Sequence, residues 1–418
     1  MRTAEHNWAD NHTFAAARIH RPASVAEVRK LVAGASRIRA IGARHSFNGV
    51  ADSPGELIDL GGIDPNFVID RERRTVTVGA GTTYSVLAAH LQREGLALHN
   101  MASLPHVTID GATATGTHGS GDRLGNLSTA VTALEMVAAS GDLVTMRRGK
   151  PDFDGMVVSL GAFGIVTRVT LDIQPSFDLR QDAFEGLPWE TVLSNLDAVM
   201  SAGYSVSLMT MWSAPAVTRL WIKTQCVGGG PETVSAAHLG ATLAARATVN
   251  TAPDAMRRLT AFGGPGPWSE RLPHFRGDEE PALAMHLQSE YMVPRARAVE
   301  AMAMLRAIGD RIDKHLLATE IRSIAGDNLW LSPSYGHDSI GIHFSWSGTP
   351  DAVHRMTAEI EDMLLPLGAR PHWGKIMHGR AEQLAPLYPK LPAFRELARR
   401  YDPVGKFRND FLDLHVFG

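Results

Sequence analysis

The sequence predicts an α+β protein built from two or three domains. The chain has 418 residues, and a domain typically holds about 100–200 residues. Its first third alternates short helical patterns with short β-branched strands, and after about residue 180 the strands alternate polar and apolar residues. This alternation is typical of half-buried strands, whereas a doubly wound parallel sheet needs continuous apolar strands between regular helices. We therefore expect α+β packing.

The N-terminal elements follow from local capping and turn residues. Ser24 and Glu27 have the spacing of a capping box, and apolar residues follow at helical spacing. Ile38–Ile41 is predicted to be a strand that ends at Gly42. The further elements predicted before Pro175 are a strand at 74–79, a helix at 84–94, a hairpin at 133–146 and a strand at 164–173.

The second half carries alternating strands, a glycine-rich stretch and two longer helical patterns. Residues 226–280 contain two Gly/Pro clusters, at 228–231 and 263–267, which predict mostly loop. Thr349 and Pro350 stand in the preferred places at the start of a helix. The other predicted elements are strands at 204–212, 219–223, 319–324 and 339–346, and a long helix at 294–312. A separate basic and aromatic tail follows Pro371.

Composition excludes several classes of protein. The 41 Lys and Arg against 44 Asp and Glu give a net charge of −3, which lacks the basic signature of a nucleic-acid binder. Cys226 is the single cysteine, so no intramolecular disulfide and no CxxC zinc site can form, and we expect a reducing compartment. No close spacing of metal ligands, apolar leader or long apolar run occurs. We therefore expect a cytoplasmic protein without a metal or a membrane partner.

Two segments have the residue types of a ligand-binding loop. Gly111–Gly121 lacks bulky apolar side chains, so its backbone and hydroxyl groups suit an anion such as a diphosphate. The alternative is a flexible surface loop, because neither common nucleotide fingerprint is present. Gly42–Phe47 follows a strand and holds His45 on a glycine-started turn, and the alternative there is a structural histidine bonded to a neighbour.

The late strands place polar side chains on shared faces. Because side chains alternate along a strand, Glu320 and Arg322 share one face, and His343 and Ser345 share another. These faces either line a pocket or face water. The turn at Arg370–Lys375 adds several hydrogen-bond donors.

Together these motifs resemble the FAD-linked sugar and polyol oxidases of the vanillyl-alcohol-oxidase fold, with the alditol (xylitol) oxidases as the most similar group. They occur in the order and at the spacing of that family over essentially the whole chain. The motifs are the segments 42–47, 100–106, 111–121, 320–322, 343–346 and 372–375.

The resemblance implies a covalent flavin and a polyol site. His45 matches the histidine that bonds to the flavin ring, and segment 111–121 would wrap the FAD diphosphate. The residues expected at the cofactor are Ile41, Gly42, Ala43, Arg44, His45, Ser46, Phe47, Ser103, Gly111, Thr113, Ala114, Thr115, Gly116, His118, Gly119, Ser120, Gly121, Val166 and His372. The residues expected at the substrate are Ser103, Glu320, Arg322, Ser345 and Lys375, with Lys375, Arg322 and Glu320 assigned to catalysis.

The activity implied is FAD-dependent oxidation of the terminal hydroxyl of an alditol such as xylitol or sorbitol to the aldose. The hydride would go to flavin N5, and O2 would reoxidise the flavin to give H2O2. The alternative on the same scaffold is an aldonolactone oxidase or dehydrogenase. Many relatives have glycine at the position of Arg44, and Ser345 stands where alditol oxidases commonly have threonine.

The resemblance also implies a domain plan. Residues 1–180 would form the FAD-binding domain from two α+β subdomains. Residues 181–370 would form a substrate cap, an antiparallel sheet flanked by helices, and residues 371–418 would return to the FAD domain. We expect a monomer whose partners are the polyol and O2.

Overall fold

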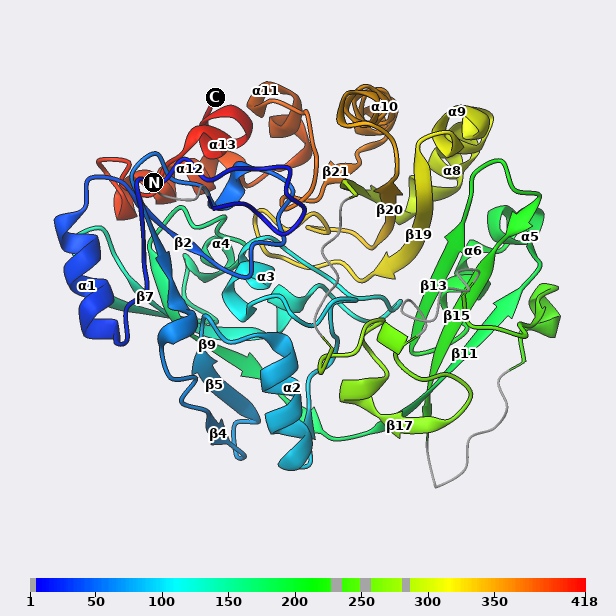
Figure 1. Ribbon diagram of the computed structural model, residues 1–418, viewed down its shortest axis with the longest axis horizontal. Coiled ribbons are helices and arrows are strands. Elements are labelled where there is room, and N and C mark those ends of the chain that lie inside the picture. Colours follow the sequence, from blue (N-terminus) through cyan, green and yellow to red (C-terminus); the bar gives the residue numbers. More distant parts are fainter. Residues whose placement is uncertain (1–4, 227–234, 249–256, 280–285) are drawn as a thin grey trace.

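The computed structural model describes residues 5–226, 235–248, 257–279 and 286–418. The predicted α+β class is confirmed, because helices alternate with mainly antiparallel sheets (Figure 1). The glycine cluster predicted as loop at 228–231 lies outside the described residues.

The N-terminal half contains two larger sheets and a two-stranded antiparallel pair, β10-β6. A small parallel sheet has the order β1-β3-β2, and an antiparallel sheet has the order β4-β5-β9-β7-β8. The strands of this half are β1 (Arg18–His20), β2 (Ile38–Ile41), β3 (Glu56–Asp59), β4 (Val68–Asp70), β5 (Thr75–Gly79), β6 (Leu96–Ala97), β7 (Val131–Val137), β8 (Leu143–Arg147), β9 (Ile165–Asp172) and β10 (Gln174–Pro175). Its helices are α1 (Val25–Gly34), α2 (Tyr84–Arg93), α3 (Ile109–Ala114) and α4 (Phe153–Val157).

The second half is dominated by a nine-stranded antiparallel sheet, ordered β16-β11-β15-β13-β19-β20-β18-β21, with β17 also paired to β11. Its strands are β11 (Asp178–Glu185), β13 (Ser205–Thr210), β15 (Arg219–Cys226), β16 (Thr242–Leu243), β17 (Pro265–Pro267), β18 (Gln288–Pro294), β19 (Leu316–Ile324), β20 (Ser339–Trp346) and β21 (Arg370–Pro371). β12 (Leu187–Pro188) and β14 (Ala216–Val217) form a separate pair. The helices of the second half are α5 (Trp189–Ser194), α6 (Leu196–Met200), α8 (Ala298–Ala307), α9 (Gly309–Asp313), α10 (Pro350–Leu364), α11 (Ala381–Leu384), α12 (Leu391–Tyr401) and α13 (Asp410–Leu412).

Side-chain alternation gives the large sheet an apolar face and a polar face. Ile321, Ile342 and Phe344 are fully buried in an apolar cluster that also includes residues of α5, α6, α8 and α10. The intervening residues Glu320 and His343 line a cavity instead. Helices α8, α9 and α10 lie along one side of this sheet (Figure 1). The sheet therefore separates a structural core from a polar wall.

Two local predictions are wrong. The helix predicted from Pro294 begins only at Ala298, because Pro294 ends β18, and it breaks before Gly309. Gly309 packs against the backbone of Trp212 and Ser213, where a Cβ would lie only 2.9 Å away. The segment predicted as loop at 111–121 begins inside helix α3. The described part of 226–280 is mostly loop as predicted, with the short strand β17 inside it.

The C-terminal segment packs into the N-terminal core. Trp373, Phe394 and Phe407 belong to the same buried cluster as residues of β5, β7 and β9, and α12 and α13 lie beside the N-terminal strands (Figure 1). The Phe163 and Phe394 rings lie 4.9 Å apart. This distribution supports the proposed division near residues 180 and 370, which stays a prediction.

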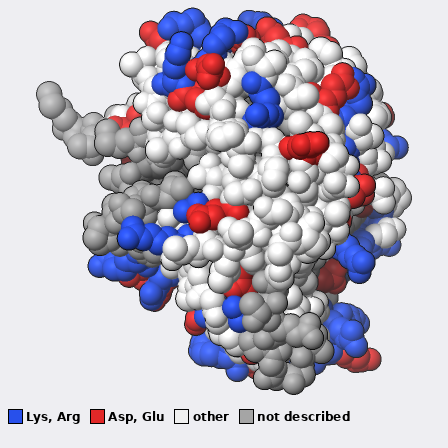
Figure 2. Space-filling view, turned by 90° about the vertical axis from the view of Figure 1, so that its right-hand side faces the viewer, with Lys and Arg blue, Asp and Glu red and all other residues white. Residues whose placement is uncertain are grey.

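Charged side chains of both signs are interspersed on the face beyond α5 and β11 (Figure 2). They gather toward the margin, and the centre of this face carries few of them. On its described part we see no broad patch of one sign. Across the described helices, none is long and apolar enough to cross a membrane.

A buried cation ties three distant segments together. Arg39 on β2 is 3% exposed, and its Nη2 donates to the carbonyls of Val50 at 2.7 Å and Leu160 at 2.6 Å. Its Nη1 donates to the carbonyl of Phe407 in the C-terminal segment. Burial lowers the pKa of Arg39 to about 10, so it remains a cation at neutral pH.

Arg39→Met should lower the free energy of unfolding by about 3 kcal/mol or more, because each buried carbonyl left without a donor costs about 1–3 kcal/mol. Urea unfolding followed by tryptophan fluorescence measures the loss. Arg73→Met is the control, since its side chain is 82% exposed, and its effect should stay within about 0.5 kcal/mol. Equal stabilities of the two variants would contradict this role for Arg39.

Candidate active site

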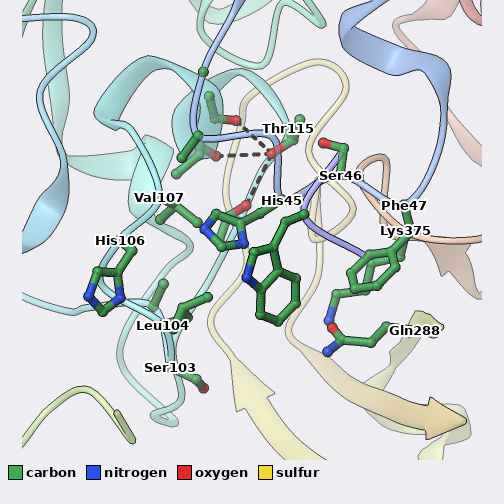
Figure 3. Close-up of a pocket in the computed structure, with 18 of the residues that line it drawn as sticks. His45, Ser46, Phe47, Ser103, Leu104, His106, Val107, Thr115, Gln288 and Lys375 are labelled. Carbon is green, nitrogen blue, oxygen red and sulfur yellow. Dashed lines mark hydrogen bonds between the residues drawn. The ribbon is translucent and has the colours of Figure 1, made fainter. Parts of the chain in front are cut away.

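One large cavity lies between the N-terminal loops and the polar face of the nine-stranded sheet. Its volume is about 1130 Å³, above the range of roughly 300–1,000 Å³ usual for small-molecule sites. His45, Ser103 and Lys375 come from three separate segments and line this one cavity (Figure 3).

The structure brings most of the predicted site residues together. Those that line the cavity are Ile41, Gly42, Ala43, Arg44, His45, Ser46, Phe47, Ser103, Gly111, Ala114, Thr115, His118, Val166, Glu320, Arg322, Ser345, His372 and Lys375. Those that are not among its lining residues are Thr113, Gly116, Gly119, Ser120 and Gly121.

The residues that do not line the cavity make contacts that hold the surrounding fold together. Thr113 Oγ1 donates to the carbonyl of Ile109 at 3.0 Å within α3, and Ser120 Oγ donates to the carbonyl of Val206. Gly119 packs so closely on Asn100 that a Cβ would lie 2.2 Å from its Oδ1. The sequence showed a segment poor in bulky side chains, but not which of its residues would face the cavity.

His45 has the environment of a neutral nucleophile. Burial, followed by the nearby His106, lowers the pKa of His45 to about 4. Its Nδ1 is buried and lacks a hydrogen-bond partner, and the ring lies 4.8 Å from that of Trp8. A neutral imidazole with an unused nitrogen in a cavity can attack an electrophile or accept a hydrogen bond from a ligand.

The turn before His45 has an unusual backbone. Arg44 has a φ of 61°, a left-handed conformation that favours glycine. Its side chain forms an ion pair with Glu5, and its carbonyl accepts from Trp8 N at 2.8 Å. These contacts hold the turn although its conformation favours glycine.

Two glycines let the backbone approach closely. A Cβ on Gly42 would lie 2.3 Å from Thr108 Oγ1, and a Cβ on Gly111 would lie 2.8 Å from the same atom. Both residues line the cavity. Any side chain at Gly42 would therefore shift the wall of the cavity.

Charged side chains gather at the polar face of the sheet. Arg322 on β19 donates through Nη1 to Ser103 Oγ at 3.0 Å, and its Nε lies 3.7 Å from Glu320 Oε1. Burial lowers the pKa of Arg322, but Glu320 and Glu290 outweigh it, so the pKa is raised. Burial raises the pKa of Glu320, but Arg322, His274 and His343 outweigh it and lower the pKa to about 2. Both groups are therefore charged at neutral pH.

The sequence analysis missed Glu290. This carboxylate on β18 is 1% exposed, and its Oε2 lies 2.8 Å from Lys375 Nζ while its Oε1 lies 2.8 Å from Arg322 Nη2. The available signal is weak: a single acidic residue stands before the apolar residues Tyr291, Met292 and Val293, which end at Pro294. The helix predicted from Pro294 drew attention away from this strand.

Three neutral histidines also line the cavity. Burial is the largest cause that lowers the pKa of His343 well below its usual value, and Lys375 lowers it further. Burial lowers the pKa values of His274 and His372 to about 3. His372 Nδ1 accepts from the backbone N–H of Gly374 at 3.0 Å, so its proton lies on Nε2.

Comparison with known proteins decides the family. Residues 16–147 match the family described as FAD binding domain, and residues 281–415 match D-arabinono-1,4-lactone oxidase. The chain is 41% identical to an alditol oxidase of a Streptomyces species over 415 residues, which is 99% of each chain.

The chain belongs to the FAD-linked sugar and polyol oxidases.

More distant relatives and a solved structure agree with this family. An L-gulono-1,4-lactone dehydrogenase of Mycobacterium tuberculosis is 29% identical over 97% of both chains, and an L-gulonolactone oxidase of Mus musculus is 26% identical over 97% of both. Cholesterol oxidase from B. sterolicum aligns with a TM-score of 0.79 at 17% identity, covering 98% of this chain and 96% of that one. This likeness confirms the predicted vanillyl-alcohol-oxidase type of fold.

The side chains and the volume of the cavity are suited to FAD. It offers an orphaned buried imidazole nitrogen at His45, a glycine-lined wall at Gly42 and Gly111, and sufficient volume. Within the described part of the chain, no group of three or more His, Cys, Asp or Glu side chains could hold a metal ion.

Gly42→Ala should reduce the FAD content of the purified protein severalfold, because the added methyl meets Thr108. Absorbance of bound flavin per polypeptide measures the content. Gly34→Ala is the control, since a Cβ there meets nothing within 4 Å and should leave the content unchanged. A full flavin complement in Gly42→Ala would refute the close approach.

Proposed function

We propose that this protein is an alditol oxidase that converts the terminal hydroxyl of xylitol or sorbitol to the aldose. The observation that carries the proposal is the set of hydrogen-bond donors and acceptors that Ser103, Glu320, Arg322, Ser345 and Lys375 bring to one cavity. The 41% identity with a protein named alditol oxidase supports it.

A polyol carries only hydroxyl groups, so a buried site must match each with a donor or an acceptor. Arg322 and Lys375 supply donors, Glu320 supplies acceptors, and the hydroxyls of Ser103 and Ser345 do either. The Arg322–Ser103 hydrogen bond, which joins the sheet to the N-terminal loops, supports contact of both with one small molecule.

Bound FAD would supply the acceptor for the hydride of the alcohol carbon and the route of its electrons to O2, which would give H2O2. The protein's own contribution is electrostatic. Lys375 and Arg322 are preorganised cations that stabilise the negative charge developing on the substrate oxygen. Arginine stays protonated and is a poor base, and the ion pair of Lys375 with Glu290 favours its ammonium form.

We further propose that His45 carries the flavin covalently. The low pKa of about 4 keeps its imidazole neutral, and the unpartnered Nδ1 is available as a nucleophile. A covalent tether would hold the cofactor in the cavity and raise its reduction potential, which favours alcohol oxidation.

The remaining assignments are extensions of the same proposal. We propose that residues 1–180 and 371–418 bind FAD, that residues 181–370 cover the substrate, and that the protein acts as a cytoplasmic monomer. Metal ions and nucleic acids have no part in this function.

The lactone oxidation of some relatives is a second candidate. It is favoured by the match of residues 281–415 to D-arabinono-1,4-lactone oxidase. Anaerobic reduction of the bound flavin by xylitol, sorbitol and L-gulono-1,4-lactone separates the two. We expect fast reduction by the polyols, and fast reduction by the lactone alone would replace the proposal with this second candidate.

Lys375→Met should keep its flavin and slow the anaerobic reduction by xylitol by about 100-fold or more, the range for loss of one preorganised charge donor. Stopped-flow absorbance measures the rate. Lys390→Met is the control, because Lys390 lies on the exposed surface before α12 and should leave the rate unchanged. Unchanged reduction in Lys375→Met would remove Lys375 from the mechanism.

His45→Ala should abolish the covalent flavin. Under denaturing conditions the intact mass of the wild-type protein should exceed that of its polypeptide by about one FAD, and the variant should not. His238→Ala, at an exposed position, should retain the added mass. Added mass that survives in His45→Ala would place the tether elsewhere.

A further inference from the structure

One buried carboxylate contacts side chains from three different segments. Glu290 Oε1 lies 2.8 Å from Arg322 Nη2 and 3.1 Å from His118 Nε2, and Glu290 Oε2 lies 2.8 Å from Lys375 Nζ. Arg322 is on β19, Lys375 follows β21, and His118 follows α3 in the N-terminal half. Glu290 therefore links the sheet to the flavin side of the cavity.

The sheet register explains how one side chain reaches all three. Glu290 pairs with His343, and His343 pairs with Glu320, so these residues form a row across β18, β20 and β19. Arg322 belongs to the next row on the same face, opposite Gly341. A Cβ at Gly341 would lie 3.4 Å from Glu290 Oε1 and 3.3 Å from His118 Cε1. The glycine thus leaves the space in which the carboxylate meets Arg322 and His118.

His118 contacts Glu290 from the N-terminal half. Its Nδ1 donates to the carbonyl of Gly119 at 2.8 Å, because a carbonyl only accepts. Its Nε2 lies 3.1 Å from Glu290 Oε1. The ring therefore lies against the carboxylate that Arg322 and Lys375 share.

Building on the proposed polyol site, we propose that Glu290 is its positioning residue. Its one carboxylate orients Arg322 and Lys375 toward the substrate and holds Lys375 in its cationic form. Its two oxygens are engaged by these two cations, so it acts through them and not on the substrate itself.

The charge of Lys375 depends on this contact. Burial lowers the pKa of Lys375, and the Glu290 carboxylate opposes that effect. The other groups that face Lys375 are Arg322 and Glu320 from β19, His343 from β20 and His372 from its own segment. Arg322 lowers the pKa and Glu320 raises it. Without the Glu290 charge, the ammonium form loses its nearest stabilising partner.

The test compares Glu290→Gln with the wild-type holoprotein in two measurements. The first is the rate of anaerobic flavin reduction by xylitol against pH. In the wild type the rate should fall as rising pH removes the proton of Lys375. In Glu290→Gln this limb should move to lower pH by roughly one to three units, the range for loss of a close opposite charge, and the maximal kcat/KM should fall by about 100-fold.

The second measurement does not depend on activity. In flavin-loaded protein labelled with 13C-lysine, the NMR signal of the Lys375 side chain, assigned with Lys375→Arg, reports whether its amine carries the extra proton. In Glu290→Gln this signal should change from the ammonium to the amine position at a lower pH than in the wild type, because the opposite charge is gone.

Two further variants separate the role of the charge from that of the side-chain length. Glu290→Asp retains the charge on a shorter side chain, so the Lys375 ammonium and the pH limb should persist while kcat/KM falls by about 10-fold or more; it serves alone if Glu290→Gln does not fold. Glu361→Gln removes another 1% exposed carboxylate, on α10 and outside the cavity lining, and should change neither readout.

The proposal fails if Lys375 loses its proton at the same pH in Glu290→Gln as in the wild type, or if Glu290→Asp shifts the Lys375 signal as far as Glu290→Gln does. Absence of flavin reduction by polyols in the wild type would instead refute the proposed function, and the lysine spectra would still decide the role of Glu290.

Discussion

A buried charge must be paired, and this requirement organises the whole active site. Moving an ion out of water costs several kcal/mol unless oppositely charged or hydrogen-bonding groups replace the water. The cavity wall contains two carboxylates, Glu290 and Glu320, and two cations, Arg322 and Lys375; Glu290 and Arg322 are buried, and the other two side chains are 14% exposed. Arg322 contacts both carboxylates. The donors that we propose for the substrate are therefore held in place by the protein itself, which is what electrostatic preorganisation requires.

The same requirement joins the two halves of the chain. His118 and Ser103 belong to the N-terminal half, yet they contact Glu290 and Arg322 of the large sheet. The backbone N–H groups of His274 and Phe275 both donate to the carbonyl of Ser103 at 3.0 Å. The proposed substrate site thus lies where the sheet and the N-terminal loops meet.

Sequence alone predicted much of the sheet face. Strand β20 has the predicted bounds, and β19 ends at the predicted Ile324. Because alternation along a strand is local, the shared face of Glu320 and Arg322 followed from spacing alone. His45 was found because a histidine on a glycine-started turn after a strand is also a local pattern.

The parts that could not be predicted depend on non-local packing. Glu290 meets Arg322 only because β18 and β19 flank β20, and Lys375 arrives from a turn about 85 residues later in the chain. Likewise, helix α3 decides whether Thr113 or Thr115 faces the cavity. This helix was not predicted, because glycine disfavours helices and the segment is rich in glycine. Local patterns fix which side chains share a face, whereas strand order fixes which charges meet.

A crystal structure of the flavin-loaded protein, soaked with xylitol without oxygen, tests the central claim most directly. We predict that a primary hydroxyl of xylitol lies within hydrogen-bond distance of both Lys375 Nζ and the Arg322 guanidinium, while both cations keep their contacts with Glu290. A polyol bound elsewhere in the cavity, or cations that leave Glu290 to reach it, would contradict the account.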